Sequence, residues 1–200
     1  MVDLYKYEKE LYSRNISLIG GVDEVGRGPL VGPVVASCVV LPKDFVLEGL
    51  TDSKKLSEKK RDLFYEYINE HALAWDVGII GPEIIDEVNI YAATKLAMKE
   101  AINKVRKKIN VEHVLIDAMP LEIDIPTTSI IKGDATCYSI SCASILAKVT
   151  RDRIMDEWDK VYPEYGFAKH KGYGTKMHIE AIQKYGPCPI HRKTFIKHFI

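Results

Sequence analysis

The sequence predicts an α/β fold whose sheet is part antiparallel and part parallel, on three observations. Two apolar runs, residues 17–24 and 34–41, flank a segment (26–33) in which Gly or Pro fills five of eight positions, which indicates a hairpin. Beyond residue 57, strand and helix patterns alternate, as they do where crossover helices join parallel strands. No linker-like stretch interrupts residues 15–160, so we expect one main domain.

The individual elements follow from local patterns. Apolar periodicity and end signals predict helices over about 3–14, 57–71, 83–109 (one or two helices), 136–162 and 175–185. Ser57 followed by Glu58 marks one helix start, and Pro82 suits the first turn of the next helix. Short apolar runs predict further strands at 72–80, 112–117 and 123–131. We expect residues 1–160 to form the main domain and 161–200, rich in Gly, Tyr and Lys, a helical extension.

The charge is balanced over the whole chain but unevenly distributed along it. The 200 residues carry 28 Lys and Arg against 28 Asp and Glu, whereas nucleic-acid-binding domains are usually basic. Residues 132–200, however, hold 12 basic and 7 acidic side chains, and residues 1–131 hold 16 and 21. The neutral total therefore does not exclude a nucleic-acid partner, and the apolar share of 46% argues against wholesale disorder.

The cysteines and the apolar runs indicate a cytoplasmic protein. Four cysteines, Cys38, Cys137, Cys142 and Cys188, form no CxxC pair and have no histidine at zinc-finger spacing, so we expect buried, reduced thiols. The first residues lack the apolar core of a secretory signal, and no run approaches 18 apolar residues.

Four carboxylates lie close to the ends of predicted strands: Asp23, Glu24, Asp117 and Asp134. One acid at such a position is more often a cap, but four favour a site, because ligand sites collect at strand ends of α/β sheets. A set of carboxylates without Cys or His suits Mg²⁺ or Mn²⁺. Two such ions can activate a water molecule and stabilise the leaving oxygen of a phosphodiester.

Basic residues supply candidate phosphate contacts, although each is also compatible with a solvated surface. Arg27 lies in a Gly-Arg-Gly turn (Gly26, Arg27, Gly28), where glycine lets the backbone approach a ligand. A tight hairpin with an Arg facing solvent fits the same residues. The other candidates are Lys54 and Lys55 in a polar loop, Lys148, Arg151 and Arg153 on the long helix, and the Gly-interleaved Lys169, His170, Lys171 and Tyr173.

The sequence resembles the ribonuclease HII family in the order and spacing of its motifs from about residue 17 to 195. These motifs are GVDEVGRGPLVGPVV at 21–35, DSKKLS at 52–57, LID at 115–117, KGD at 132–134, SISCASILAKVTRD at 139–152 and HKGYGT at 170–175. The opening motif is long and highly specific. One departure is Ala118, where many members of the family carry Gly.

The resemblance implies an RNase H-like fold, a five-stranded mixed sheet flanked by helices with a helical C-terminal extension that contributes to substrate binding. It implies cleavage of RNA in RNA–DNA hybrids and 5′ of single ribonucleotides in duplex DNA, as in ribonucleotide excision repair, leaving 3′-hydroxyl and 5′-phosphate ends. The implied metal ligands are Asp23, Glu24, Asp117 and Asp134, with two Mg²⁺ or Mn²⁺ ions and Asp152 as an auxiliary acid. The implied substrate contacts are Gly26, Arg27, Gly28 and Tyr173, and Lys54 and Lys55 are candidates for the phosphates.

Two other functional classes share part of this pattern. Another RNase H-like nuclease, such as a junction resolvase or a transposase core, would use the acids but has no need for a 2′-hydroxyl sensor. A nucleic-acid-binding module without activity would be repelled from phosphate by four acids. Sliding-clamp binding also stays open, because the C-terminal segment (193–200) has two phenylalanines that suit either a partner or the core. A monomer is the expected state.

Overall fold

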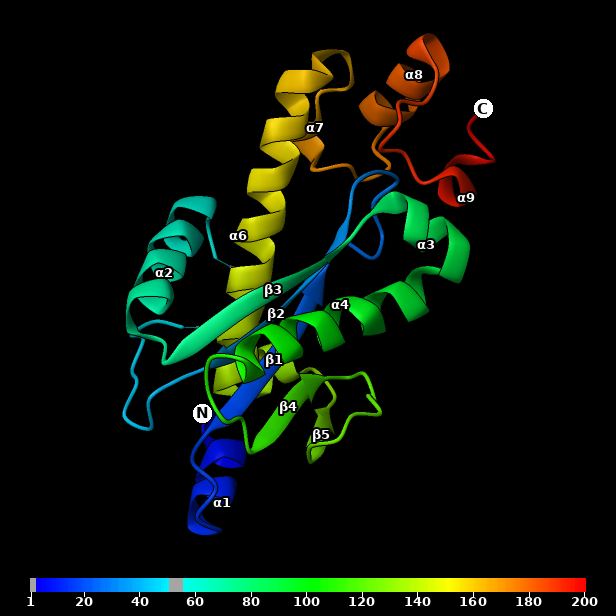
Figure 1. Cartoon of the computed structure of the whole chain (residues 1–200). Coiled ribbons are helices and arrows are strands. Elements are labelled where there is room, and N and C mark those ends of the chain that lie inside the picture. The colour runs from blue at the N-terminus through cyan, green and yellow to red at the C-terminus, as the bar shows by residue number, and fades with distance from the viewer. Residues whose placement is uncertain (1–2, 51–55) are drawn as a thin grey trace.

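The computed structural model describes residues 3–50 and 56–200. Its centre is a five-stranded sheet in the order β3-β2-β1-β4-β5 (Figure 1). The first three strands along the chain pair antiparallel, whereas β1–β4 and β4–β5 are parallel, so the predicted mixed sheet is confirmed. The strands are β1 (Ile19–Val25), β2 (Val34–Val40), β3 (Ala74–Ile80), β4 (His113–Asp117) and β5 (Thr127–Ile130).

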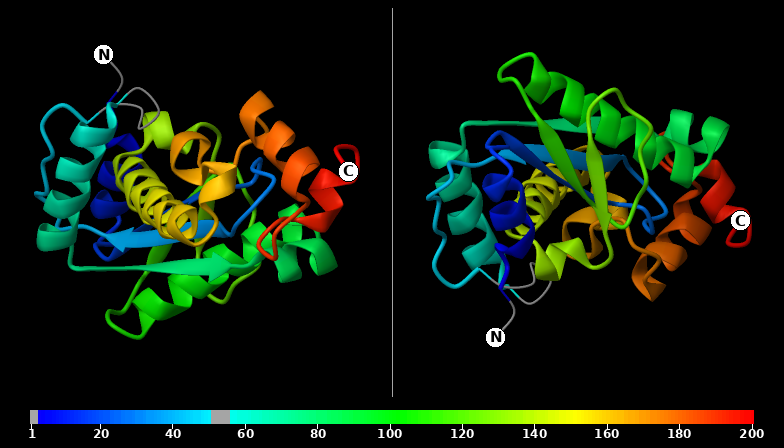
Figure 2. Two further views of the ribbon diagram at one scale, coloured as in Figure 1. Left: turned by 90° about the horizontal axis from the view of Figure 1, so that it is seen from above. Right: turned by 90° about the horizontal axis from the view of Figure 1, so that it is seen from below.

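Helices cover both faces of this sheet. The helix α4 (Ile90–Arg106) packs on one face, while α6 (Tyr138–Val161) crosses the other, with α2 (Glu58–His71) beside it (Figure 2). Two glycines allow the helices to lie directly on the strands. A Cβ on Gly78 of β3 would come within 1.9 Å of the Ala97 carbonyl oxygen of α4, and one on Gly21 of β1 within 2.3 Å of the Ser139 carbonyl carbon of α6. The β1 acids therefore lie close to α6.

The predicted helices are all found, with one division and several additions. The range 83–109 holds two helices, α3 (Pro82–Val88) and α4, separated at Asn89, whose side chain accepts hydrogen bonds from the first backbone N–H groups of α4. Four short helices among the described residues were not predicted, because they span too few residues to display a period. These are α5 (Gly133–Thr136), η2 (Pro163–Tyr165), α7 (Phe167–His170) and α9 (Lys193–Ile196).

The last forty residues share a core with the loop that joins β1 to β2. Leu30 and Val31 of that loop pack with Met155 of α6 and with Phe167 and Ile182, the latter on α8 (Lys176–Tyr185). Leu30 and Val31 are thus enclosed between α6 and the C-terminal residues, whereas Arg27 and Gly28 stay exposed. A division of the chain at residue 160 stays a prediction.

At the other end of α6, an N-terminal helix is anchored by a buried acid. In α1 (Lys6–Ser13), Glu8 is 3% exposed, and its Oε1 accepts hydrogen bonds from the Ser139 N–H at 2.9 Å and the Ser139 hydroxyl at 2.8 Å. A negative charge at a helix N-terminus is favourable, so α1 fixes the start of α6.

All four cysteines are buried and free, as expected from their spacing. Within residues 3–50 and 56–200, no helix has the length and apolar character needed to cross a membrane.

Candidate active site

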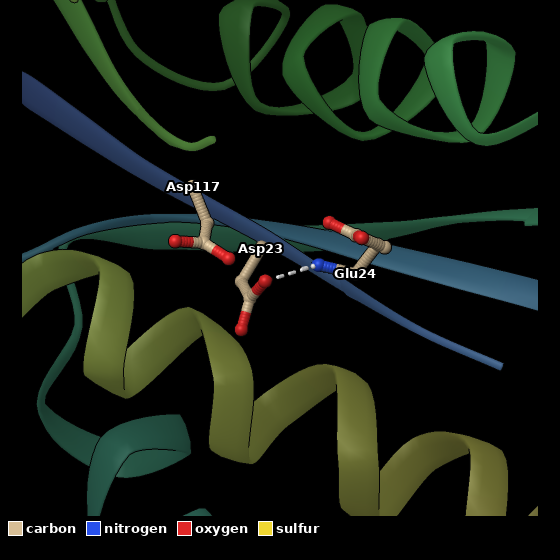
Figure 3. A group of neighbouring side chains, drawn as sticks. All are labelled: Asp23, Glu24 and Asp117. Carbon is tan, nitrogen blue, oxygen red and sulfur yellow. Dashed lines mark hydrogen bonds between the residues drawn. The ribbon is translucent and has the colours of Figure 1, made fainter. Parts of the chain in front are cut away.

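Three carboxylates meet where the parallel strands β1 and β4 lie side by side. Val22 pairs with Ile116, so the next residue on each strand, Asp23 and Asp117, come to neighbouring positions. One carboxylate oxygen from each of Asp23, Glu24 and Asp117 lies within 4.8 Å of the other two (Figure 3). The sequence analysis placed Asp23 and Glu24 just at the end of β1, whereas the strand continues to Val25.

Asp23 is the most enclosed of the three. It is 4% exposed and points towards α6, and its Oδ1 accepts a hydrogen bond from the Glu24 N–H at 2.7 Å (Figure 3). The Ser144 hydroxyl on α6 donates a second hydrogen bond to it. Burial, followed by the charges of Glu24 and Asp117, raises the pKa of Asp23 well above its ordinary value.

One carboxylate oxygen of Glu24 faces a cationic side chain, and the other has no hydrogen-bond partner among the described residues. Its Oε1 lies 3.4 Å from Nη1 of Arg27, while Oε2 is buried without a hydrogen-bond partner among the described residues. Burial raises the pKa of Glu24; the Arg27 charge acts against this shift, and Asp117 adds to it. A buried oxygen without a donor is costly unless a cation is bound there.

Asp134 lies beside the group of three rather than within it. The group that the described residues form holds Asp23, Glu24 and Asp117. Asp134 is 6% exposed on α5, and the preceding residue, Gly133, donates its N–H to Oδ1 of Asp117 at 2.6 Å. The α5 helix is therefore joined directly to the site, and a ligand role for Asp134 stays a prediction.

A cleft of about 320 Å³ opens over the three acids. Tyr173 is 43% exposed on its wall, and a Cβ placed on Gly28 would lie 3.6 Å from Cε1 of that ring. Thus Tyr173 and the Gly-Arg-Gly turn adjoin each other beside the acids. The lining residues are Asp23, Glu24, Val25, Arg61, Asp117, Ser144, Lys148 and Tyr173.

Three of these lining residues, Val25, Ser144 and Arg61, were not among the predicted site residues. Ser144 could have been found from helical spacing. It lies on one stripe of α6 with Ala147, Arg151 and Met155, at intervals of three and four residues, and all four are buried. That stripe faces the sheet, which carries Asp23. For Arg61 on α2 we find no such signal, because its place in the cleft depends on how α2 packs against α6.

The structure also decides which basic candidates are available to a ligand. Arg151, expected as a surface cation, is 0% exposed and bonds to backbone carbonyls, so that expectation was wrong. His170 is likewise buried. Lys148 lines the cleft and forms a 2.6 Å ion pair with the predicted auxiliary acid, Asp152, which is 8% exposed and not part of the carboxylate group. Lys54 and Lys55 lie outside the described residues.

A mixed sheet with clustered carboxylates at its centre, flanked by helices on both faces, is the architecture of RNase H-like nucleases. The comparisons with known proteins agree with this class. The family model of ribonuclease HII matches residues 20–198. The ribonuclease HII of Bacillus cytotoxicus is 59% identical over 194 residues, covering 97% of this chain and 74% of that protein.

Solved structures show the same fold. The ribonuclease H2 of Pyrococcus horikoshii is 28% identical with a TM-score of 0.74, covering 88% of this chain and 92% of the other. A structure of the PCNA:RNase HII complex from Archaeoglobus fulgidus has a TM-score of 0.75 at 22% identity, covering 90% and 95%. The chain belongs to the ribonuclease HII family and is a metal-dependent nuclease.

Proposed function

We propose that this chain hydrolyses the RNA strand of RNA–DNA hybrids and also cuts 5′ of single ribonucleotides in duplex DNA, as needed for ribonucleotide excision repair. Family membership supports the cleavage of hybrids. The observation that carries the finer proposal is the arrangement around the cleft. Three carboxylates lie next to an exposed tyrosine and a glycine-flanked turn, so a cutting site adjoins a surface suited to one nucleotide.

The residues present fit divalent cations. Three carboxylates within 4.8 Å of one another, one of them with an unpartnered buried oxygen, form an all-oxygen donor set that suits Mg²⁺ or Mn²⁺. Burial, with a contribution from the neighbouring acids, raises the pKa values of Asp23 and Glu24, so their charged forms are held at a cost that a bound cation would offset. We propose two ions, with Asp134 as the fourth ligand and Asp152 as an auxiliary acid.

In the proposed mechanism the chain positions the scissile phosphodiester. Asp23, Glu24, Asp117 and Asp134 would hold the cations, which would supply an activated water and charge stabilisation for the leaving oxygen. The carboxylates fix where that charge is placed, and the Ser144 hydrogen bond orients Asp23. The backbone of the Gly-Arg-Gly turn contacts the 2′-hydroxyl, and Tyr173 stacks at the RNA–DNA junction. Cleavage on the 5′ side leaves 3′-hydroxyl and 5′-phosphate ends.

The rest of the duplex would be held through its phosphates. Such binding needs no base edges, which agrees with a substrate that has no fixed sequence. We assign it to Lys54, Lys55 and the exposed basic residues of the C-terminal third, 132–200.

One gel tests this proposal. A labelled duplex with a single ribonucleotide should be cut in Mg²⁺ but not in EDTA, and an all-DNA duplex should stay intact. Asp23→Asn should lower the rate at least about a hundredfold, because it removes a proposed ligand. Cleavage of the all-DNA duplex, or wild-type turnover by the folded variant, would contradict the assignment.

Three further predictions concern context. The rings of Phe195 and Phe199 pack against the core around Ile182, so a sliding clamp would have to engage this tail without extracting them. Binding of the full chain to a sliding clamp, measured by titration, tests that contact. A cytoplasmic location and a monomeric state remain our expectations.

A further inference from the structure

A fully buried arginine forms hydrogen bonds to the Gly-Arg-Gly turn from the interior of the protein. Arg192 is 0% exposed and donates three hydrogen bonds, to the carbonyls of Gly26 at 2.6 Å, Arg27 at 3.1 Å and Gly32 at 3.0 Å. Its own backbone N–H bonds to the Leu30 carbonyl at 2.9 Å. The C-terminal segment is therefore bonded to both ends of the loop that carries the turn.

A second buried arginine joins the same loop to the segment that carries Tyr173. Arg151 donates to the carbonyls of Pro33 at 3.0 Å, Val31 at 3.2 Å and Lys171 at 2.9 Å. Lys171 is two residues before Tyr173. One guanidinium group on α6 thus helps to set the spacing between the turn and the tyrosine, together with a 2.9 Å backbone hydrogen bond from the Leu30 N–H to the Gly172 carbonyl.

Both arginines are unusual in what they bond. Among the described residues, their six side-chain hydrogen bonds all go to backbone carbonyls and none to a carboxylate. Burying a charge is expensive, and the acids whose charges act on these arginines, Asp152 on Arg151 and Asp86 on Arg192, form no hydrogen bond with them. A planar guanidinium does, however, offer five donors in a fixed fork, which lysine cannot reproduce. Geometry rather than charge pairing therefore explains why arginine occupies these positions.

The bonds of Arg192 also decide which backbone groups the turn presents. The described chain has no cis peptide bonds, and a trans peptide unit holds its N–H opposite its C=O. Since Arg192 draws the carbonyls of Gly26 and Arg27 inwards, the N–H groups of Arg27 and Gly28 point away from it. Both of these residues are exposed, and Gly28 adjoins Tyr173. Two donors are thereby presented next to the tyrosine ring.

We propose that Arg192 and Arg151 are positioning residues for ribonucleotide selection: Arg192 orients the N–H donors of the turn towards a ribose hydroxyl, and Arg151 sets their distance from Tyr173. This inference rests on the proposed function and extends it to residues outside the cleft. Neither arginine touches the substrate.

The test compares Arg192→Lys with Asp86→Ala. Asp86 accepts hydrogen bonds from the N–H groups of Lys193 and Thr194, and its charge acts on Arg192, so its loss loosens the same C-terminal segment and removes that charge but leaves the guanidinium itself in place. On a duplex with one ribonucleotide, Arg192→Lys should lower kcat about tenfold or more, and Asp86→Ala less than twofold. Binding of an all-DNA duplex should be unchanged in both variants, because it does not use the hydroxyl.

Further readouts separate positioning from simple loss of structure. The backbone amide signals of Gly26 and Gly28 in a ¹⁵N–¹H spectrum should move in Arg192→Lys and stay in Asp86→Ala. Ethylguanidinium should restore part of the activity of Arg192→Ala, whereas ethylammonium should not. If Arg192→Lys does not fold, Arg151→Lys should give the same loss of kcat with unchanged DNA binding.

Wild-type kcat in a folded Arg192→Lys, or equal losses in Arg192→Lys and Asp86→Ala, would overturn the inference. If the wild type itself failed to cut at a single ribonucleotide, the proposed function would be wrong. The amide signals would still report whether Arg192 orients the turn.

Discussion

Single hydrogen bonds to the carboxylate group should tune how tightly it holds a cation. The Ser144 hydroxyl donates to Asp23, which lies at the centre of the group. Loss of a residue that orients a metal ligand typically costs ten- to a hundredfold in affinity or activity. We expect Ser144→Ala to raise the Mg²⁺ concentration for half-maximal cleavage about tenfold.

A matched control lies on the same helix. The Thr150 hydroxyl is buried and has no hydrogen-bond partner among the described residues. Thr150→Val should therefore leave the Mg²⁺ titration unchanged. Identical titrations for Ser144→Ala and Thr150→Val would mean that the serine does not orient Asp23.

The residue after Asp117 carries a local strain. Ala118 has a φ of 44°, in the left-handed region, where a Cβ costs roughly 1–2 kcal/mol. Ala118→Gly should relieve this strain and raise the free energy of unfolding by about 1 kcal/mol. The larger conformational entropy that glycine gives the unfolded chain reduces this gain. Urea unfolding measures it, and a decrease would show that the strain is absent.

At the scale of elements, α1 and α6 are joined through one carboxylate. Glu8 accepts from the Ser139 backbone and side chain, and also from the Cys137 thiol at 3.3 Å. Glu8→Ala would leave these donors buried and unsatisfied, which costs about 1–3 kcal/mol. Unfolding in urea should show this loss, while Glu10→Ala, on the exposed side of α1, should cost less than about 0.5 kcal/mol.

The elements themselves could be predicted, because their signals are local. The hairpin over 17–41, Ser57 as a helix cap and the strand ending on Asp117 each depend on residues a few positions apart, and each was confirmed. The contact between Asp23 and Asp117 followed from two strand ends. The resemblance to a family added roles that local patterns alone do not supply.

What could not be predicted depends on contacts between distant residues. Arg192 bonds to carbonyls 160 to 166 positions earlier, and nothing in its immediate sequence indicates a buried guanidinium. Residue type predicts a surface position for Arg151, because basic residues usually lie there, although the spacing places it on the buried stripe of α6. At both positions the contacts between distant residues, rather than the residue type, determine that the arginine is buried.

On the scale of the whole molecule, stability should depend on a chain of neutral histidines. Backbone N–H of Cys188 donates to Nδ1 of His191, so that ring carries its proton on Nε2. It then donates to Nε2 of His178 at 3.1 Å, and Nδ1 of His178 donates to the Tyr173 carbonyl at 2.9 Å. These three bonds link the C-terminal segment, α8 and the Tyr173 loop.

Each of the two histidine rings uses one nitrogen as a donor and the other as an acceptor, so neither ring has a free nitrogen for a further proton. Burial lowers the pKa of His178 and of His191 to about 4, from an ordinary value of 6.5. Between these pH values the unfolded chain binds protons at the two histidines and the folded chain does not. The contribution of these histidines to the free energy of unfolding therefore falls as the pH decreases from about 6.5 towards 4.

The raised pKa values of Asp23 and Glu24 act in the opposite direction, and they are the same in a variant that removes one histidine. We therefore expect the urea midpoint of His178→Gln to fall less, or rise more, than that of the wild type between pH 7 and pH 5. Equal changes in the two proteins would contradict this.

The contacts of Arg192 also impose an order on how the protein acquires its activity. The sheet and its covering helices are complete by residue 161. The hydrogen bonds to the carbonyls of the turn at 26–28, however, come from Arg192, more than 160 positions later. Contacts between such distant residues form late, because a long loop must first be closed. In a chain emerging from the ribosome, the cluster of acids should therefore form before the turn becomes rigid. The nuclease activity should accordingly appear later than the fold of the sheet and its helices.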